Sequence, residues 1–298
     1  MRTRTLRTFA FALLASVALA ATAQAATVQW EGQSPIDINE QNVVSSPLTE
    51  KIQFFYQPET VVLTNTYNSQ GSTPKEWATL KGKPASGPAF NSYVEVNGEK
   101  YVLAQFHFHA KSEHTINGVQ SPMEVHLVHL RLHDNGTPYC IGEPQSLLVL
   151  GALIDEGPGR KLYGRIFNLT DLPQDSSQPN KTIEGFNLAR MLPRGASYRY
   201  HGSLTAPLSV DCSKDVFGAE TELYNPNNVN YNSTGASQLA DHTLGEDGSF
   251  PEAVHWVVMS THLTLKRSQI TAFEALFPEG NARPVQDAKS RVVRLMGQ

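Results

Sequence analysis

The chain has 298 residues, which allows one large domain or two small ones. Its 40% hydrophobic and 17% charged residues are typical of a globular protein with a sizeable core. A formal net charge of −4 gives no reason to expect binding to nucleic acid or to an anionic membrane.

Residues 1–25 have the pattern of a cleaved export signal. Arg2, Arg4 and Arg7 form a positively charged start, and Leu6–Ala20 is a mainly apolar run that is too short to span a membrane comfortably. The Ala23-Gln24-Ala25 segment is typical of a cleavage site and predicts a mature domain of residues 26–298. Removing three arginines and no acidic residue changes the net charge from −4 to −7. We therefore predict a periplasmic or secreted protein that binds no membrane after signal cleavage.

Most of the mature chain reads as β-strands. The runs rich in β-branched and aromatic residues are Gln53–Tyr56, Thr60–Leu63, Tyr93–Val96, Tyr101–His109, Met123–Leu132, Leu147–Ile154 and Val254–Met259. Asn97-Gly98 between two of these runs predicts a hairpin. Two short helices are expected, over Phe186–Leu192 and over Ser268–Leu276 with Ser268 as the cap. The pattern predicts a single, mainly β (mixed α+β) domain with one large sheet and a few short peripheral helices.

Three histidines on two of these strands predict a metal site. Side chains alternate along a strand, so His107 and His109 share a face, roughly 7 Å apart along the strand. On the next predicted strand, Glu124 and His126 repeat this spacing. Three imidazoles without a cysteine suit a catalytic Zn²⁺ that keeps one position open for water.

The alternative for each histidine is a buried core residue with a satisfied hydrogen bond. Two neighbouring residues favour the metal site instead. Gln105 and Glu124 each lie two residues before a candidate ligand, on the same face, where each can accept a ring N–H and fix a histidine tautomer.

Five segments surround or extend the histidine pattern, namely QSPIDI from Gln33, QFHFHAKSEHTING from Gln105, MEVHLVH from Met123, YHGSLTAP from Tyr200 and NARPVQ from Asn281. Together they resemble the α-class carbonic anhydrases. They lie in that family's order and extend over residues 30–290, nearly all of the mature chain. The resemblance implies a twisted, mostly antiparallel ten-stranded sheet with the metal at the floor of a central cone.

The same resemblance implies a function and its residues. The expected enzyme is a zinc lyase, carbonate dehydratase, in which zinc-bound hydroxide attacks CO₂ and gives bicarbonate and a proton. Thr205 and Glu113 match the pair that orients the hydroxide. The substrate pocket is expected to comprise Val128, Val149, Leu204, Thr205 and Ala206.

Three features depart from the family or extend beyond its motifs. Tyr67 stands where fast relatives have a proton-shuttle histidine, and phenols carry protons poorly at neutral pH because they ionise near pH ~10. An insertion occupies about residues 215–252. Cys140 and Cys212 are an even pair, which favours a disulfide in an oxidising compartment, with free buried thiols as the alternative. The resemblance places both cysteines near the rim of the pocket.

Other functions remain open at this stage. The chain is alternatively a carbonic-anhydrase-like binding module with weak or no catalysis, although such a module typically lacks a zinc histidine. A different zinc hydrolase is the third interpretation, and weak esterase activity is expected as a side reaction. The expected partner is a small molecule, CO₂ or bicarbonate, and the protein is expected to be a monomer or a homodimer.

Overall fold

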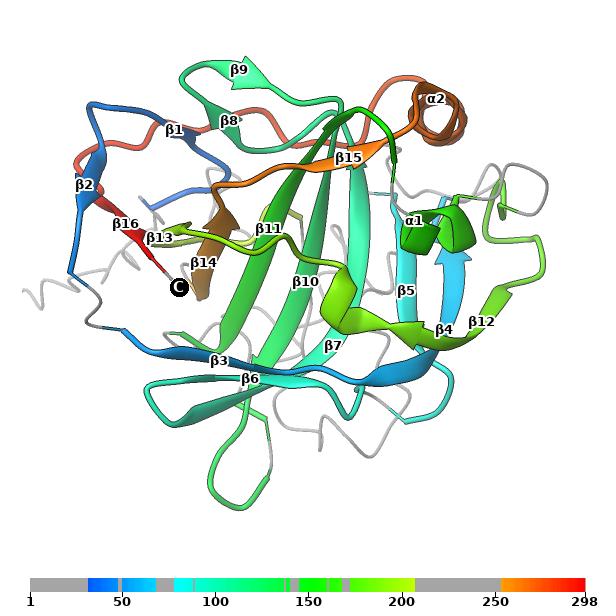
Figure 1. The fold of residues 1–298 in the computed structure, drawn as a ribbon, viewed down its shortest axis with the longest axis horizontal. Coiled ribbons are helices and arrows are strands. Elements are labelled where there is room, and N and C mark those ends of the chain that lie inside the picture. The colour runs from blue at the N-terminus through cyan, green and yellow to red at the C-terminus, as the bar shows by residue number, and fades with distance from the viewer. Residues whose placement is uncertain are drawn as a thin grey trace, which may run out of the picture.

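A computed structural model of the chain describes residues 32–47, 50–67, 78–87, 89–136, 138–139, 145–159, 161–167, 172–206 and 253–297. These residues form one large sheet with a small three-stranded sheet beside it (Figure 1). Within these ranges, no helix has both the length and the apolar character needed to cross a bilayer. The predicted signal, the 215–252 insertion and both cysteines lie outside the described residues.

The large sheet confirms the predicted mainly β architecture. Ten strands form its continuous path, in the order β12 (Lys181–Asn187), β4 (Pro58–Asn65), β5 (Leu80–Pro84), β7 (Glu99–Ala110), β10 (Met123–Arg131), β11 (Leu147–Glu156), β14 (Val254–Met259), β13 (Ser197–Gly202), β16 (Val293–Met296) and β2 (Val43–Ser45). Three more strands join this path, namely β3 (Ile52–Phe55), β6 (Tyr93–Val96) and β15 (Leu263–Leu265). Most pairs are antiparallel, and the parallel ones are β11 with β14, β11 with β15, and β16 with β2.

The small sheet and the helices lie at the periphery of the large sheet (Figure 1). The small sheet comprises β1 (Asp37–Ile38), β8 (Thr115–Ile116) and β9 (Val119–Gln120). The helical elements are α1 (Lys161–Ile166), the single 3₁₀ turn η2 (Leu188–Arg190) and α2 (Arg267–Leu276). The expectation of a few short peripheral helices is therefore confirmed.

Two local predictions about helices are wrong. The segment predicted as a helix over Phe186–Leu192 continues β12 as far as Asn187 and then makes only the turn η2, because pairing with β4 extends the strand. The second helix is present, but Ser268 does not cap it. The cap position is Lys266, whose backbone N–H donates to the Gln269 side chain.

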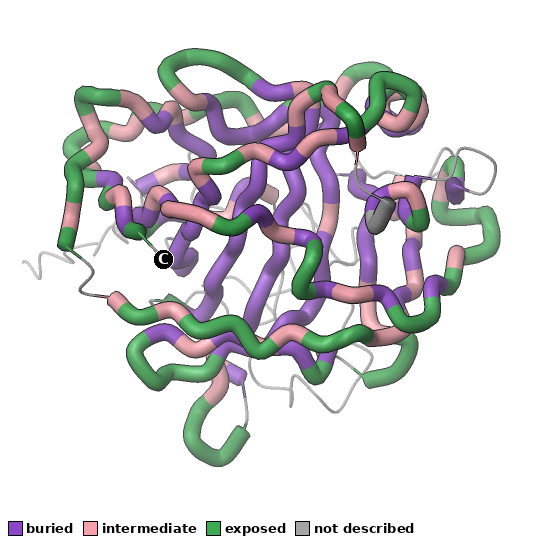
Figure 2. The backbone as a smooth tube through the Cα atoms, in the orientation of Figure 1, coloured by how far each residue is buried: buried purple, intermediate pink, exposed green. Residues whose placement is uncertain are grey.

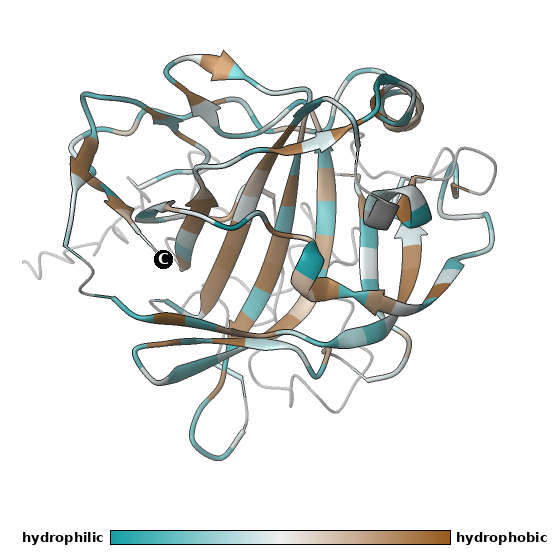
Figure 3. Ribbon diagram, viewed as in Figure 1, coloured by the Kyte–Doolittle hydropathy of each residue, from teal (hydrophilic) through white to brown (hydrophobic). Residues whose placement is uncertain are grey.

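The two faces of the large sheet carry separate apolar clusters. On β7, Phe106 and Phe108 belong to the larger cluster, and the Phe108 ring contacts Phe273 of α2 and Phe167 just after α1, with centroids 6.1 and 4.9 Å away. The central strands are buried, whereas β3 is largely exposed (Figure 2). Polar and apolar residues alternate along β10 and the end of β7, whereas β11 is almost continuously apolar (Figure 3). One face of β7 therefore packs into the core and leaves the other for polar side chains.

The predicted hairpin at Asn97-Gly98 is confirmed. It joins β6 to β7, and both residues have positive φ, 52° for Asn97 and 92° for Gly98. Asparagine and glycine tolerate this left-handed backbone better than other residues, which is why the dipeptide marks such turns. The turn fixes where β7 begins and hence which β7 residues face the polar side.

Candidate metal centre

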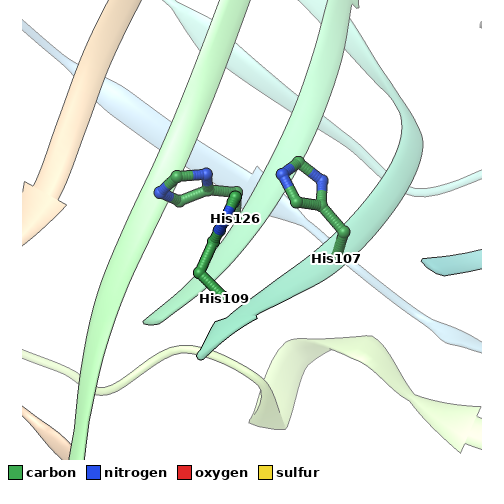
Figure 4. Close-up of side chains that lie close together, drawn as sticks. All are labelled: His107, His109 and His126. Atoms are coloured by element: carbon green, nitrogen blue, oxygen red, sulfur yellow. The ribbon is translucent and has the colours of Figure 1, made fainter. Parts of the chain in front are cut away.

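The three predicted histidines meet on one face of the sheet. In the antiparallel register of β7 and β10, His126 lies directly opposite His107, and Glu124 lies opposite His109. The ring centroids are 4.9 Å apart for His107 and His109, 5.2 Å for His107 and His126, and 4.7 Å for His109 and His126. Figure 4 shows the three imidazoles turned toward one another from the two strands. One nitrogen from each ring lies within 4.8 Å of the other two, so the group could hold a metal ion.

Hydrogen bonds to the outer nitrogens define which ring atom of each histidine faces inward. The Gln105 Oε1 atom lies 2.9 Å from His107 Nδ1, and Glu124 Oε1 lies 2.9 Å from His126 Nε2. Because both oxygens are acceptors here, the contacted nitrogens carry the protons. The lone pairs are then on His107 Nε2 and His126 Nδ1.

His109 is held by a residue that the sequence did not predict for this purpose. Its Nδ1 donates to the backbone oxygen of Asn281 at 2.9 Å. Its Nε2 is buried and has no hydrogen-bond partner in the described part of the chain. A buried, unpartnered nitrogen costs free energy unless something binds it, and an imidazole lone pair beside two others suits Zn²⁺. The residues present therefore fit a zinc ion.

Glu124 connects the histidines to the loop after β7. Its Oε1 accepts from His126 and, at 2.8 Å, from His114 Nδ1, while its Oε2 accepts the backbone N–H groups of Glu113 and His114. Burial alone would raise the pKa of Glu124, but His114 and His126 hold it well below its usual range. Gly151 leaves room for this network, because a Cβ there would lie 2.9 Å from Glu124 Oε1.

The pKa values of the histidines follow from burial and from the nearby carboxylates. Burial, with the positive charge of neighbouring groups, holds the pKa of His107 well below its ordinary value. Burial also lowers the pKa of His109, although Glu113 opposes the shift. For His126, burial is outweighed by Glu124, which raises its pKa. His107 and His109 are consequently neutral at ordinary pH, the form in which imidazole binds metals.

Glu113 lies near the histidines, and no hydrogen bond joins it to Thr205 among the described residues. Glu113 is buried, and its Oε1 accepts the backbone N–H of Arg283 at 2.8 Å. Its Oε2 lies 3.8 Å from His126 Nδ1 and has no hydrogen-bond partner among the described residues. Thr205 is buried in the loop after β13. Glu113 therefore has a buried acceptor oxygen beside the histidines that makes no hydrogen bond within the described residues.

Three of the predicted pocket residues form an apolar wall, whereas Ala206 lies at the end of a loop. Val128 and Val149 are directly opposite each other on β10 and β11 and belong to the apolar cluster on the histidine face, against which Leu204 packs. Ala206 is half-buried at the end of the described part of that loop. Val128 also lies opposite Gln105, so this apolar wall adjoins the metal centre.

Tyr67 does not pack with the histidines or with the apolar wall beside them. It is partly buried and packs against the larger apolar cluster, which includes Phe106 and Phe108 from the opposite face of β7. Its backbone is fixed by an N–H bond to Asn65 Oδ1 and by accepting the N–H of Ser176.

His114 is the remaining histidine of the network. Its two ring nitrogens contact Glu124 and, at 2.7 Å, the hydroxyl of Tyr200, so both are occupied. Tyr200 belongs to the YHGSLTAP segment but was assigned no contact from sequence. Its distance in the chain from His114, 86 residues, explains why pattern alone did not reveal the pair.

Comparisons with known proteins agree with this geometry. The family model of the eukaryotic-type carbonic anhydrases matches residues 21–217. A carbonic anhydrase of Neisseria gonorrhoeae is 29% identical over 265 residues, which cover 88% of this chain and 77% of that protein. The solved complex of the α-carbonic anhydrase from Thermovibrio ammonificans with sulfanilamide matches with a TM-score of 0.61 and 27% identity, over 89% of this chain and 87% of the other. A hyperthermostable carbonic anhydrase from a hydrothermal vent chimney gives a TM-score of 0.59 and 29% identity, over 89% and 88%.

Proposed function

The chain belongs to the eukaryotic-type, α-class carbonic anhydrase family, and we propose that its histidine cluster binds Zn²⁺ for reversible hydration of CO₂ to bicarbonate and a proton. The family is zinc-dependent and its relatives are carbonic anhydrases. The observation that carries the proposal is the convergence of three inward nitrogens whose partner nitrogens are already occupied. His107, His109 and His126 would be the ligands, with Gln105, Asn281 and Glu124 fixing their orientation.

Zinc, when bound, supplies hydroxide from water at ordinary pH, an effect for which carbonic anhydrase is itself the standard example. The residues of this chain would orient that nucleophile. Glu113 is buried, and its Oε2 can accept a hydrogen bond from the Thr205 hydroxyl. The Thr205 oxygen is then left to accept from the attacking hydroxide, which aims the hydroxide lone pair at the carbon of CO₂.

The apolar wall beside the histidines would receive the substrate. Carbon dioxide is small and carries no net charge, so a surface of Val128, Val149 and Leu204 binds it without the competition from water that a polar wall would allow. Ala206 has no hydroxyl where many relatives have a threonine, so it would offer bicarbonate one contact fewer. Thr205 and Ala206 complete the proposed pocket.

Release of the product proton is the slow part of the proposed cycle. Tyr67 is the residue at the shuttle position by resemblance, and its packing against the opposite face favours a route through water and buffer instead. We expect turnover to rise with imidazole concentration, since imidazole can carry the proton outward. The measurement is stopped-flow hydration at fixed pH. A high turnover that is indifferent to imidazole would contradict this part of the proposal.

The main experiment combines metal analysis with stopped-flow CO₂ hydration on the wild type and on His109→Ala. We expect one zinc per chain and hydration activity in the wild type, and loss of both in the variant. The matched control is His262→Ala, which removes a histidine bound to Asp155 rather than to the cluster. A zinc-free wild type, or a His109→Ala variant of equal activity, would refute the site assignment.

The same experiment separates the alternatives. A wild type that binds zinc but does not hydrate CO₂ would indicate a carbonic-anhydrase-like binding module. Weak hydrolysis of an activated ester is expected as a side activity, and it should disappear in His109→Ala together with hydration if one site performs both.

We also propose that residues 1–25 are removed on export to the periplasm or the medium and that Cys140 and Cys212 form a disulfide. The mass of the exported protein tests both. Cleavage should leave a chain starting at Ala26, and reduction should add about 2 Da for one disulfide. An intact N-terminus would contradict the proposed cleavage, and an unchanged mass on reduction would contradict the proposed disulfide. Sedimentation would distinguish the expected monomer from a homodimer.

A further inference from the structure

Two histidines lie side by side on the sheet face opposite the candidate metal centre. His201 of β13 and His255 of β14 are directly opposite each other in the antiparallel register of these strands. Tyr200 and Trp256, their neighbours in sequence, belong to the apolar cluster on the face of the metal centre. Because consecutive residues of a strand point to opposite faces, the two histidines lie on the other side of the sheet.

The two rings are spaced like the rings of the candidate metal centre. Their centroids are 4.9 Å apart, and their planes are tilted by 42°. In the metal centre the three centroid distances lie between 4.7 and 5.2 Å. Imidazole nitrogens bind zinc at ~2 Å, so rings at this spacing can hold one ion between them.

Both rings also have nitrogen atoms available for an ion. Neither His201 nor His255 makes a side-chain hydrogen bond to another described residue. His255 is 3% exposed, and a buried imidazole without a hydrogen bond costs free energy unless something binds it. His201 is exposed and gives an ion access from solvent. Desolvation of its ring, and then the nearby His255, lower the pKa of His201, so the ring keeps a lone pair at ordinary pH.

The surrounding charges decide which class of ion fits. Glu50 Oε2 lies 3.4 Å from His255 Nε2, but it also accepts a hydrogen bond from Arg199 Nη1 at 2.8 Å. Arg294 adds positive charge near His201. One carboxylate with two guanidinium groups disfavours Ca²⁺ and Mg²⁺, which depend on oxygen ligands. Cu²⁺, Ni²⁺ and Zn²⁺ bind imidazole strongly, and Cu²⁺ binds it most tightly of the three.

We propose that His201 and His255 form a second metal site, for a divalent transition-metal ion, on the face opposite the candidate metal centre. Each ring supplies one nitrogen, and water completes the coordination. Glu50 accepts the N–H of His255 Nε2 once the ion is bound, so His255 Nδ1 is the ligand atom. Glu124 has the same relation to His126, at 2.9 Å. The second site is separate from the proposed hydration of CO₂ and does not depend on it.

Copper binding tests this site. We would titrate the zinc-loaded protein with Cu²⁺ in a calorimeter and repeat the titration on a His107→Ala, His109→Ala double variant, whose central site is incomplete. The electron paramagnetic resonance spectrum of the bound copper is recorded for both. His201→Gln and His255→Gln, each added to the double variant, remove one proposed ligand. His262→Gln in the same background is the matched control, because this histidine lies beside a carboxylate but contacts no second histidine ring in the described part of the chain. Unfolding midpoints are measured on every variant.

We expect one Cu²⁺ per chain in both proteins, with a spectrum split by two ligand nitrogens. His201→Gln and His255→Gln should each weaken binding by at least about tenfold, because one of two protein ligands is lost, whereas His262→Gln should stay within about twofold. No copper bound to the double variant, unchanged affinity in His201→Gln, or an equal loss in His262→Gln would overturn the second site. His201 is exposed, so its variant decides the question if His255→Gln does not fold. Absence of zinc or of hydration in the wild type would overturn only the proposed function.

Discussion

Glu124→Gln tests whether the orientation of His126 depends on the buried carboxylate. One oxygen of Glu124 accepts two ring N–H groups, from His114 and His126, and the other accepts two backbone N–H groups. Glutamine keeps one acceptor oxygen but replaces the other with an NH₂ group, which only donates. If the amide oxygen stays with the backbone groups, the NH₂ faces the two rings. His126 must then carry its proton on Nδ1, the nitrogen that faces the other two histidines.

The size of the effect follows from these contacts. A hydrogen bond to a charged group contributes about 1.5–3 kcal/mol, so losing the two bonds that this one oxygen accepts should lower the free energy of unfolding by about 3 kcal/mol or more. Loss of an outer partner of a ligating histidine weakens metal binding by about 10- to 100-fold, a range to which studies of carbonic anhydrase itself contributed. Urea denaturation of the metal-free protein measures the first quantity, and competition with a chelator of known zinc affinity measures the second.

Glu59→Gln is the matched control for this prediction. Glu59 is a carboxylate of β4 that also accepts four hydrogen bonds, from the backbone and side chains of Asn91 and Ser92. It contacts none of the three histidines, so its replacement should lower stability without changing zinc affinity. A Glu124→Gln protein that binds zinc within twofold of the wild type would refute the reasoning, and so would an equal loss of affinity in Glu59→Gln.

Three further predictions concern the fold around the site. Burial would raise the pKa of Glu50, but His255 and Arg199 outweigh it and lower the pKa from 4.5 to about 2. The ionised Glu50 carboxylate therefore stabilises the folded protein fully above pH 4.5, and this stabilisation is lost as the pH falls toward 2. Urea titrations at several pH values should show the wild type about 1 kcal/mol more stable than Glu50→Gln above pH 4.5, a figure that allows for the partial exposure of Glu50. This difference should disappear between pH 4.5 and pH 2. Asn281→Ala removes three side-chain hydrogen bonds and should lower the free energy of unfolding by about 2–4 kcal/mol, and an unchanged urea midpoint would contradict this. Gly82→Ala forces a Cβ against an aromatic ring of the core and should cost about 1–3 kcal/mol in the same assay, whereas a neutral result would mean that the ring moves freely.

The strands that sequence predicted best are those with a clear apolar or aromatic pattern. Tyr93–Val96 and Val254–Met259 match β6 and β14 at both ends, and the period-two alternation correctly placed His107 and His109 on one face. Each of these strands contains the β-branched and aromatic residues that pack well on a pleated surface. Local pattern was sufficient wherever the side chains themselves favour the strand.

β5 shows where local pattern fails. Its sequence, Leu80-Lys81-Gly82-Lys83-Pro84, contains a glycine, a proline and two lysines, none of which favours a strand. It is nevertheless extended because β4 and β7 pair with it on both sides. The pairing depends on strands that lie elsewhere in the chain, and it also places Lys81 beside His107, a juxtaposition that the sequence pattern did not predict.

In the metal centre, too, the sequence predicted the contacts between neighbouring residues and missed those between residues far apart in the chain. Gln105 and Glu124 precede their histidines by two residues on the same strand, so strand periodicity predicted both partners. The partner of His109 is the backbone oxygen of Asn281, 172 residues away, and a backbone atom has no residue type for a pattern to reveal. The Asn281 side chain also binds Ala110 and Phe108 on β7, which fixes the C-terminal segment against the strand that carries the ligands. The position of His109 consequently depends on the docking of a segment whose contribution becomes visible only when the whole chain has folded.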